Sequence, residues 1–364
     1  MAVARRVRAR LRALFATAKW VIFGLVTYFF VLPLIPGFRR AFTELAQVDA
    51  PYLLVGVALQ LTAVLTYSLL TKASAAEGLA GVSVIRLFRI QLSTKMVGNV
   101  LPGGTAASSA LGYRLLRLSG VSGPDAGFAL TTAGLGSAVV LNLILWIGLI
   151  ASIPGRGVNP VYGTSAIVGV IVMLVAAAMV FGVVDGHGHA ERVLRWIATK
   201  VRLDPDRAAA VLRHLGARLI ALGSDRGLLV RVLAWATLNW LIDAASLWVF
   251  LRAFGQSVPL DVLIVTFGLA NIVAVVPITP GGLGIVEGVY IPTLVGFGLS
   301  RSEATLGVLT YRIAQYWLPI VIGAAIYLSL RVGPFAIERR DALQSLGRMA
   351  RQPINTDELG AAGE

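Results

Sequence analysis

The chain has 364 residues, of which 57% are hydrophobic and only 14% are charged, with a mean hydropathy of +0.80 and a formal net charge of +14. Soluble domains contain about 25% charged residues, so this composition excludes an ordinary globular enzyme and indicates a polytopic membrane protein. The chain is too apolar for its positive charge to indicate nucleic-acid binding. Because it has no cysteine, disulfides, iron–sulfur clusters and thiol nucleophiles are excluded.

Six stretches are apolar enough to cross a bilayer as helices, which takes about 20 residues each. In chain order they cover residues 20–36, 51–71, 125–153, 161–184, 228–253 and 304–330. The first follows an arginine-rich segment, as the apolar part of a signal peptide does. It ends at Pro33 and Pro36 without a small-residue cleavage site. We therefore expect it to be an uncleaved first span.

Positive charge predicts the orientation of these spans, because cytoplasmic segments are enriched in Lys and Arg. The basic segments are residues 1–19, residues 185–227 and the chain after residue 331. With six spans, all three lie on one side, so we expect both termini to be cytoplasmic. Residues 185–227 have an amphipathic pattern, which suits either helices in an anionic headgroup layer or a basic connector. The polar residues 341–364 are expected to be disordered.

Two further stretches, residues 82–122 and 260–300, are partly apolar but interrupted in the middle. The interruptions are Pro102-Gly103-Gly104 and Pro280-Gly281-Gly282. Proline removes a backbone donor and glycine ends a helix at little cost. Irregular backbone at membrane depth is tolerated only where protein or a wet cavity surrounds it. We therefore expect both stretches to be re-entrant helical hairpins.

The two interruptions belong to an internal repeat with a constant offset of 178 positions, as between Pro102 and Pro280. The same offset relates Gly120 to Gly298 and Ser122 to Ser300. The repeat units are then residues 51–153 and 229–331, and the single span 161–184 between them inverts the second unit. We predict an all-α polytopic membrane protein with one transmembrane domain, residues 20–335. It contains six spans and two Pro-Gly-Gly re-entrant hairpins in an inverted-topology repeat, an arrangement typical of secondary transporters.

The hairpin tips and the ionisable residues at membrane depth form the candidate substrate site. Helix N-termini at the tips would present free N–H groups to an anion such as phosphate. Charges inside a membrane are costly, at about 2.5–3.5 kcal/mol each, and normally pair or line a polar pathway. Glu287 with Arg312 is the preferred pair, and Asp243 is the alternative partner of Arg312. The candidate residues are Lys95, Asn99, Pro102, Gly103, Gly104, Asp243, Pro280, Gly281, Gly282, Gly284, Glu287 and Arg312.

Two of these features also have purely structural interpretations. The Glu287–Arg312 pair would then only hold the second hairpin in place. Gly284 and Gly288, which form a GxxxG pattern, would serve close packing between helices instead of ligand binding.

The segment Pro280-Gly-Gly-Leu-Gly-Ile-Val-Glu287-Gly288, together with Asn99-Val-Leu-Pro-Gly-Gly104, resembles the transmembrane region of lysylphosphatidylglycerol flippase/synthase proteins. The resemblance covers about residues 15–335. It implies a bacterial plasma-membrane protein that moves a lipid between leaflets, with Glu287 and Arg312 at recurrent polar positions of the family. The chain departs from the family in having no acidic residue in Thr105-Ala-Ala-Ser-Ser109. We also expect it to lack the soluble aminoacyl-transferase domain of the synthase proteins.

The leading hypothesis is therefore a flippase or scramblase for a phosphate-bearing lipid, with anionic headgroups as the expected partners. We expect neither enzymatic activity nor a cofactor or metal, because the chain has no phosphate-binding loop and only three histidines. Two alternatives stay open: an ion-coupled transporter of small solutes, in which Glu287 would carry a proton, and a membrane scaffold for a lipid or sugar transferase.

Overall fold

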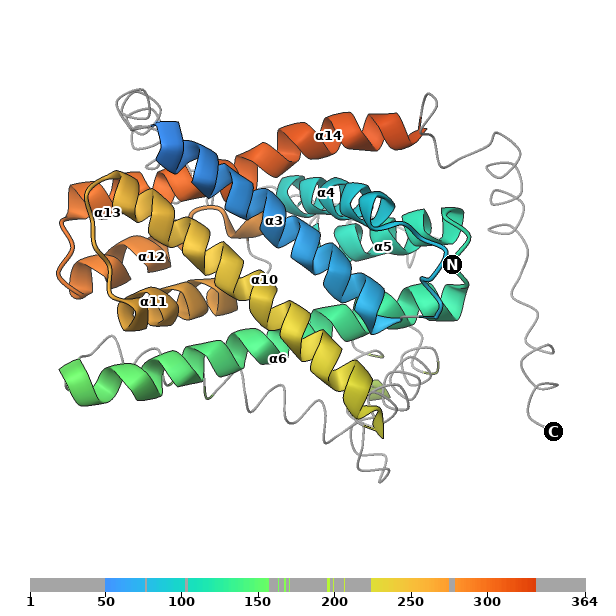
Figure 1. Ribbon diagram of the computed structural model, residues 1–364, viewed down its shortest axis with the longest axis horizontal. Helices are drawn as coiled ribbons and strands as arrows, with labels where there is room; N and C mark the ends of the chain where they lie inside the picture. The colour runs from blue at the N-terminus through green and yellow to red at the C-terminus, as the bar shows by residue number, and fades with distance from the viewer. Residues whose placement is uncertain are drawn as a thin grey trace, which may run out of the picture.

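Figure 1 shows the computed structural model of the protein, which describes residues 50–75, 77–101, 104–156, 224–274 and 279–331, together with single positions between 163 and 206. Within these ranges all regular structure is helical. The segments 1–19, 20–36 and 341–364 lie outside the described residues, as do nearly all of 161–184 and 185–223. The predictions made for those segments stay predictions.

Within the described residues, four helical segments are long and apolar enough to cross a membrane. They are α3 (Ala50–Ser74), α6 (Gly123–Arg156), α10 (Arg226–Ala253) and the continuous run of α13 (Arg301–Arg312), η4 (Ile313–Trp317) and α14 (Leu318–Arg331). The 25 residues of α3 rise about 37 Å, which exceeds the hydrocarbon thickness of a bilayer. These segments cover four of the six stretches predicted as spans.

The remaining helices form two packed pairs, each interrupted where the sequence predicts a break. The first pair is α4 (Val84–Val100) and α5 (Gly104–Leu118); the second is α11 (Leu260–Val273) and α12 (Ile285–Gly296), with the 3-10 turn η3 (Pro280–Gly282) before α12. None exceeds 17 residues, so each rises only about 18–26 Å. The two pairs lie at opposite ends of the bundle, α4–α5 on the right and α11–α12 on the left of Figure 1.

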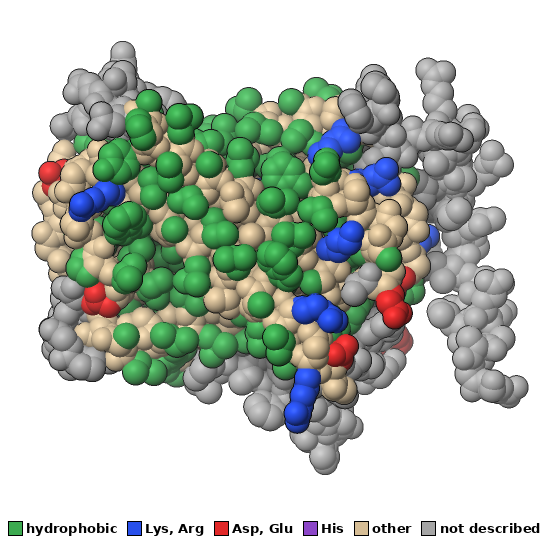
Figure 2. Space-filling view, in the orientation of Figure 1, with side chains coloured by type: hydrophobic (Ala, Val, Ile, Leu, Met, Phe, Trp, Pro, Cys, Tyr) green, Lys and Arg blue, Asp and Glu red, His purple; other side chains and the backbone are tan. Residues whose placement is uncertain are grey.

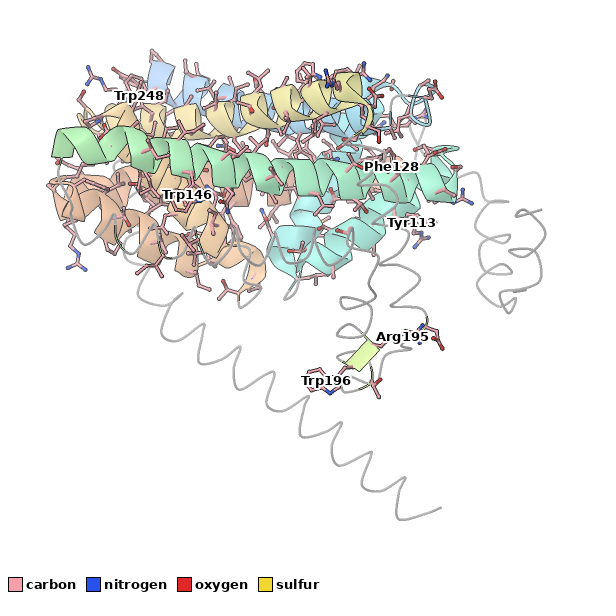
Figure 3. The ribbon with its side chains drawn as sticks, turned by 90° about the horizontal axis from the view of Figure 1, so that it is seen from below. Tyr113, Phe128, Trp146, Arg195, Trp196 and Trp248 are labelled. Carbon is pink, nitrogen blue, oxygen red and sulfur yellow. The ribbon has the colours of Figure 1, made fainter. Side chains whose placement is uncertain are left out.

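The helices α3 and α10 run antiparallel and form one layer of the bundle. Polar side chains join them inside this layer: Asn239 Nδ2 donates to the Ala63 carbonyl at 2.6 Å, and Ser246 Oγ donates to the Gly56 carbonyl at 3.0 Å. In the orientation of Figure 1, the two pairs of short helices lie behind this layer. In Figure 3, which is seen from below, the layer of α3 and α10 is at the top, the short helices lie below it, and α6 crosses the bundle towards the viewer. The helix α14 packs against α4, so it reaches from the second pair to the first.

An offset of 178 positions in the sequence relates helices of the first repeat unit to helices of the second, and after this shift their first and last residues nearly coincide. Applied to α3 it gives residues 228–252, within α10, and applied to α6 it gives a start at Arg301, where α13 begins. The ends of α5 and α12 also match. Val121 N–H donates to the Leu116 carbonyl beside Gly120 (φ +89°), and Leu299 N–H donates to the Leu294 carbonyl beside Gly298 (φ +98°). The two segments therefore share local structure as well as sequence.

The face of the bundle shown in Figure 2 is apolar over its middle and charged towards its ends. Exposed apolar side chains on α3 and α10 include Leu54, Val55, Leu65, Leu238 and Leu241. A contiguous apolar surface of this kind is unfavourable in water and suits contact with lipid. Among the described residues, basic side chains occur in the last turn of α3, in α4 and α5 and in the first turns of α10, namely Lys72, Arg86, Arg89, Arg114, Arg117, Arg226 and Arg231, whereas Arg252 and Arg301 lie at the end of α10 and the start of α13.

Candidate functional site

The second Pro-Gly-Gly segment is a tight turn that requires glycine at three positions. Gly281, Gly282 and Gly284 have φ values of +53°, +69° and +83°, which side-chain-bearing residues rarely adopt. A Cβ on Gly281 would also lie 2.5 Å from the ring of Tyr316. The glycine at position 281 is therefore needed both for the turn and for the close approach of the turn to η4.

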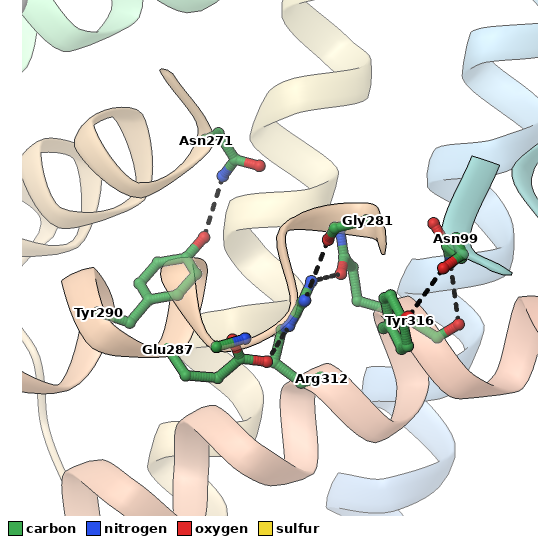
Figure 4. Close-up of polar contacts among 9 residues, drawn as sticks. Asn99, Asn271, Gly281, Glu287, Tyr290, Arg312 and Tyr316 are labelled. Carbon is green, nitrogen blue, oxygen red and sulfur yellow. Dashed lines mark hydrogen bonds and ion pairs between the residues drawn. The ribbon is translucent and has the colours of Figure 1, made fainter. Parts of the chain in front are cut away.

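Arg312 and Glu287 form a buried ion pair beneath this turn, with Arg312 Nε 2.6 Å from Glu287 Oε1. The side chains are 2% and 0% exposed. The guanidinium also donates to Gln315 Oε1 at 2.6 Å and to the Gly281 carbonyl at 3.2 Å, and it lies 4.9 Å from the centre of the Tyr316 ring (Figure 4). The predicted pairing of Glu287 with Arg312 is confirmed, and Arg312 uses its donors within the protein.

The other oxygen of Glu287 closes the N-terminus of α12. Glu287 Oε2 accepts a hydrogen bond from the Gly284 N–H at 2.7 Å, as the acidic member of a capping box does. A carboxylate at this place satisfies the free N–H and the positive end of the helix dipole. The start of α12, where an anionic ligand was expected, is therefore already occupied by a side chain of the same helix.

The two interruptions meet near the middle of the bundle. Asn99 Nδ2 donates to the Tyr316 carbonyl at 2.9 Å, and Tyr316 Oη donates to the Asn99 carbonyl at 2.8 Å. Tyr316 belongs to η4, a π-helical turn, and such turns often occur at functional sites. Asn99 lies in the last turn of α4, and the position of a Cβ on Gly281 is 3.1 Å from Asn99 Oδ1. The end of α4, the η3 turn and η4 therefore form a single contact.

The start of α5 depends on another glycine. A Cβ on Gly104 would lie 2.0 Å from the Gly98 carbonyl oxygen of α4, so only glycine lets α5 begin directly against α4. Pro102 and Gly103 lie outside the described residues. At Gly288, in contrast, an added Cβ would meet nothing within 4 Å among the described residues, which gives no support to a close-packing role there.

Asp243 lies between α10, α3 and α13. Its Oδ1 accepts hydrogen bonds from Gln60 Nε2 at 2.7 Å and from Tyr311 Oη at 2.8 Å, and its side chain is 8% exposed. Asp243 is therefore not the hydrogen-bonding partner of Arg312. The ring of Tyr311 packs edge-on against Tyr290, whose hydroxyl accepts from Asn271 Nδ2 at 3.0 Å.

Lys95 is the remaining candidate charge, and its environment differs from that of Arg312. It lies one helical turn before Asn99, on the same face of α4. The side chain is half-buried, and it lies close enough to Asp243 and Arg312 to interact electrostatically with both. Its ammonium group forms no hydrogen bond or ion pair within the described part of the chain. Of the candidate cations, Lys95 is therefore the one with donors available to a ligand.

The structure thus brings most of the candidate residues together and adds neighbours that the sequence argument missed. Asn99, Gly281, Gly282, Gly284, Glu287 and Arg312 surround the meeting point of the interruptions, with Pro280 at the start of η3. Tyr316, Gln315, Gln60 and Tyr311 were not among the candidates. Gln60 could have been identified from the sequence, because it is a polar residue inside an apolar span. Gln315 and Tyr316 could have been identified because they follow Arg312 on the same helical face.

Comparison with known proteins identifies similar membrane proteins. The chain is 22% identical to a UPF0104 membrane protein of Methanothermobacter thermautotrophicus over 295 residues, which is 77% of this chain and 86% of the relative. It is 21% identical to the UPF0104 membrane protein PH1989 of Pyrococcus horikoshii over 327 residues, or 85% of this chain and 96% of the relative. The inner membrane protein YbhN of Escherichia coli is 30% identical over 95 residues, which is 26% of this chain and 29% of that protein.

The sequence profile of the lysylphosphatidylglycerol synthase transmembrane region matches residues 11–323, which is most of the chain. The resemblance found in the Pro-Gly-Gly segments is thereby confirmed. The protein is a membrane protein, and it belongs to the family of the lysylphosphatidylglycerol synthase transmembrane region.

Proposed function

We propose that the protein moves a phosphate-bearing lipid, either a phospholipid or a lipid-linked substrate, between the leaflets of the bacterial plasma membrane. In this proposal the protein is a transporter, uses no cofactor and is not itself an enzyme. Its direct partners are membrane lipids with anionic headgroups, and a lipid-modifying or glycosyl transferase would act before or after it.

The membrane arrangement that we propose has six spans and two re-entrant hairpins in an inverted repeat. Three observations support it: the four long apolar helices, the two short-helix pairs at opposite ends of the bundle, and the shared local structure at an offset of 178 positions. The basic end of the bundle, where α4 and α5 enter, is the cytoplasmic end. On this topology the N- and C-termini are cytoplasmic, and α11 and α12 enter from the outer side.

The observation on which the function rests is that the two interruptions meet beside Lys95, a half-buried lysine whose ammonium has no partner within the described residues. Broken helices that approach from opposite sides place the substrate site of many transporters near the membrane midplane. A phosphate at that depth would cost many kcal/mol without a compensating charge. Lys95 supplies such a charge, whereas Arg312 is already engaged by Glu287, Gln315 and the Gly281 carbonyl.

The outer surface of the bundle is compatible with a lipid substrate. Apolar side chains are exposed along α3 and α10 and also on α14, where Val321 and Leu328 are 70% and 62% exposed. Acyl chains of a substrate lipid can remain in contact with such a surface while the headgroup crosses. Family membership points in the same direction, because the family is named for a lipid-modifying protein.

Reconstitution of the purified protein tests the proposal. Vesicles with and without protein would be loaded with fluorescent analogues of an anionic phospholipid, a zwitterionic phospholipid and a neutral glycerolipid that lacks phosphate. A membrane-impermeant quencher then reports how fast each analogue reaches the outer leaflet. We expect the protein to accelerate exchange of the phosphate-bearing analogues. Equal rates with and without protein for all three would overturn the proposal.

A further inference from the structure

A second buried acid, Asp243, has a different environment from Glu287. Glu287 has a cationic partner, Arg312, and its second oxygen accepts a backbone N–H, so both oxygens are satisfied as an ionised carboxylate. Asp243 has only neutral donors, Gln60 and Tyr311, and both donate to the same oxygen, Oδ1. No Lys, Arg or His forms an ion pair with Asp243 in the part of the chain that the structure describes. An unpaired ionised carboxylate at membrane depth is costly.

The side-chain amide of Gln60, next to Asp243, lacks a hydrogen-bond donor for its oxygen. Gln60 is 2% exposed, and its Nε2 donates to Asp243 Oδ1, whereas its own Oε1 is a buried acceptor without a hydrogen-bond partner in the described structure. A buried acceptor without a donor is rare and costs about 1–3 kcal/mol. A carboxylic acid and a primary amide can pair through two hydrogen bonds, with the amide N–H donating to one acid oxygen and the acid O–H donating to the amide oxygen. Only the first of these bonds exists between Gln60 and an ionised Asp243.

We propose that Asp243 is the proton-binding residue of the transporter, and that its protonated carboxyl group donates to the unpartnered Gln60 Oε1. One proton then removes the uncompensated charge and supplies the missing donor. The reaction is the reversible release of this proton from the carboxylic acid to water, which leaves a carboxylate and breaks the hydrogen bond to Gln60 Oε1. This inference rests on the proposed function for its physiological role but not for the protonation itself.

The groups around Asp243 determine what protonation would change. Tyr311 on α13 donates to Asp243, Tyr290 on α12 and Lys95 on α4 are close enough to interact with its charge, and its neighbour Gln60 on α3 is neutral. The described acids of α6 and α11, Asp125 and Asp261, lie in the first turns of their helices. Arg312, next to Tyr311 on α13, is already paired with Glu287. Lys95 is therefore the cation that a carboxylate at position 243 would attract.

Protonation of Asp243 would therefore control the availability of Lys95. When Asp243 is neutral, the ammonium of Lys95 is free to bind a phosphate headgroup. When Asp243 has lost its proton, its carboxylate competes with the phosphate for Lys95. Headgroup binding and proton binding then favour each other, as two linked ligands must, and the lipid and the proton move in the same direction.

Infrared spectroscopy of the purified protein tests the protonation independently of transport. We expect a carboxylic-acid C=O band at neutral pH that is lost in Asp243→Asn, shifted in Gln60→Leu and unchanged in Asp261→Asn, a control that removes a carboxylate from the end of α11. If the band is absent from the wild-type protein, or persists unchanged in Asp243→Asn, the assignment is wrong whether or not the protein moves lipids.

Leaflet exchange at different pH values tests the coupling. With one proton per lipid, we expect the exchange rate of an anionic phospholipid to change by up to about tenfold per pH unit. In Asp243→Asn, whose amide can both donate to Gln60 Oε1 and accept from Gln60 Nε2, the exchange rate, compared with the variant's own rate at neutral pH, should no longer depend on pH. If wild type and Asp243→Asn show the same pH dependence, the coupling is refuted while the proposed function stands. If wild type gives no exchange above protein-free vesicles at any pH, it is the proposed function that fails.

Discussion

Asn99 and Tyr316 exchange two hydrogen bonds although they are 217 positions apart in the sequence. Each residue uses its side chain to satisfy the backbone carbonyl of the other, so the end of α4 and the π-helical turn η4 are linked reciprocally. Because α4 lies in the first half of the chain and η4 in the second, this contact joins the two halves at the place where both are interrupted.

Removing either side of this contact should destabilise the protein by about 0.5–1.5 kcal/mol per hydrogen bond. We expect Tyr316→Phe and Asn99→Ala each to lower the melting temperature in detergent, measured by intrinsic tryptophan fluorescence. Each substitution removes a different bond to a backbone carbonyl, so both single variants should be destabilised. If neither substitution lowers the melting temperature, the reciprocal contact is contradicted.

Gly281→Ala should destabilise the protein by about 1–3 kcal/mol. The added methyl would lie 2.5 Å from the Tyr316 ring, on a backbone with φ of +53°. Gly288→Ala is the matched control in α12, since a Cβ there meets nothing within 4 Å among the described residues. Denaturation midpoints of the two variants compare them directly. The assigned turn geometry is contradicted if Gly281→Ala is as stable as Gly288→Ala.

The Glu287–Arg312 pair should show strong coupling between its members. Each single variant, Glu287→Gln or Arg312→Met, leaves one buried charge uncompensated and should cost about 3–5 kcal/mol. The double variant removes both charges and should recover much of this loss. A double variant with stability equal to the sum of both single effects would argue against the ion pair.

Gly104→Ala should disrupt the junction of α4 and α5 more than any glycine substitution on an open helix face. The added Cβ would lie 2.0 Å from the Gly98 carbonyl oxygen, so the two helices must separate. Gly134→Ala in α6, where nothing among the described residues lies within 4 Å of an added Cβ, should be neutral or stabilise by up to about 1 kcal/mol. Thermal unfolding of both variants under the same conditions provides the comparison, and equal stability would contradict the close junction.

The helices and their interruptions could be predicted from sequence because both depend on local composition. Apolar stretches give α3, α6, α10 and α13–α14, and the Pro-Gly-Gly segments fall where α4–α5 and α11–α12 are interrupted. The pairing of Glu287 with Arg312 could also be predicted, since opposite charges at membrane depth seek each other.

The details of the site depend on the three-dimensional packing and were not accessible to the same reasoning. Asn99 meets Tyr316 only because α14 packs along α4, where a Cβ on Gly323 would lie 2.4 Å from the Leu92 carbonyl oxygen. Arg312 was considered as an anion-binding cation, but the structure surrounds it with Glu287, Gln315 and the Gly281 carbonyl. The capping of α12 by Glu287 likewise removes one of the two expected anion-binding helix ends.

The central claim is that the site beside the two interruptions moves a phosphate headgroup with the help of Lys95. Leaflet exchange of an anionic phospholipid should be compared in vesicles containing wild type, Lys95→Gln or Lys72→Gln. Lys72 is the matched control, because its ammonium donates to the Val82 carbonyl at the end of the bundle. Loss of a charge-assisted hydrogen bond predicts a decrease of about tenfold or more for Lys95→Gln and a wild-type rate for Lys72→Gln. A Lys95→Gln protein that exchanges the lipid as fast as wild type would contradict the claim.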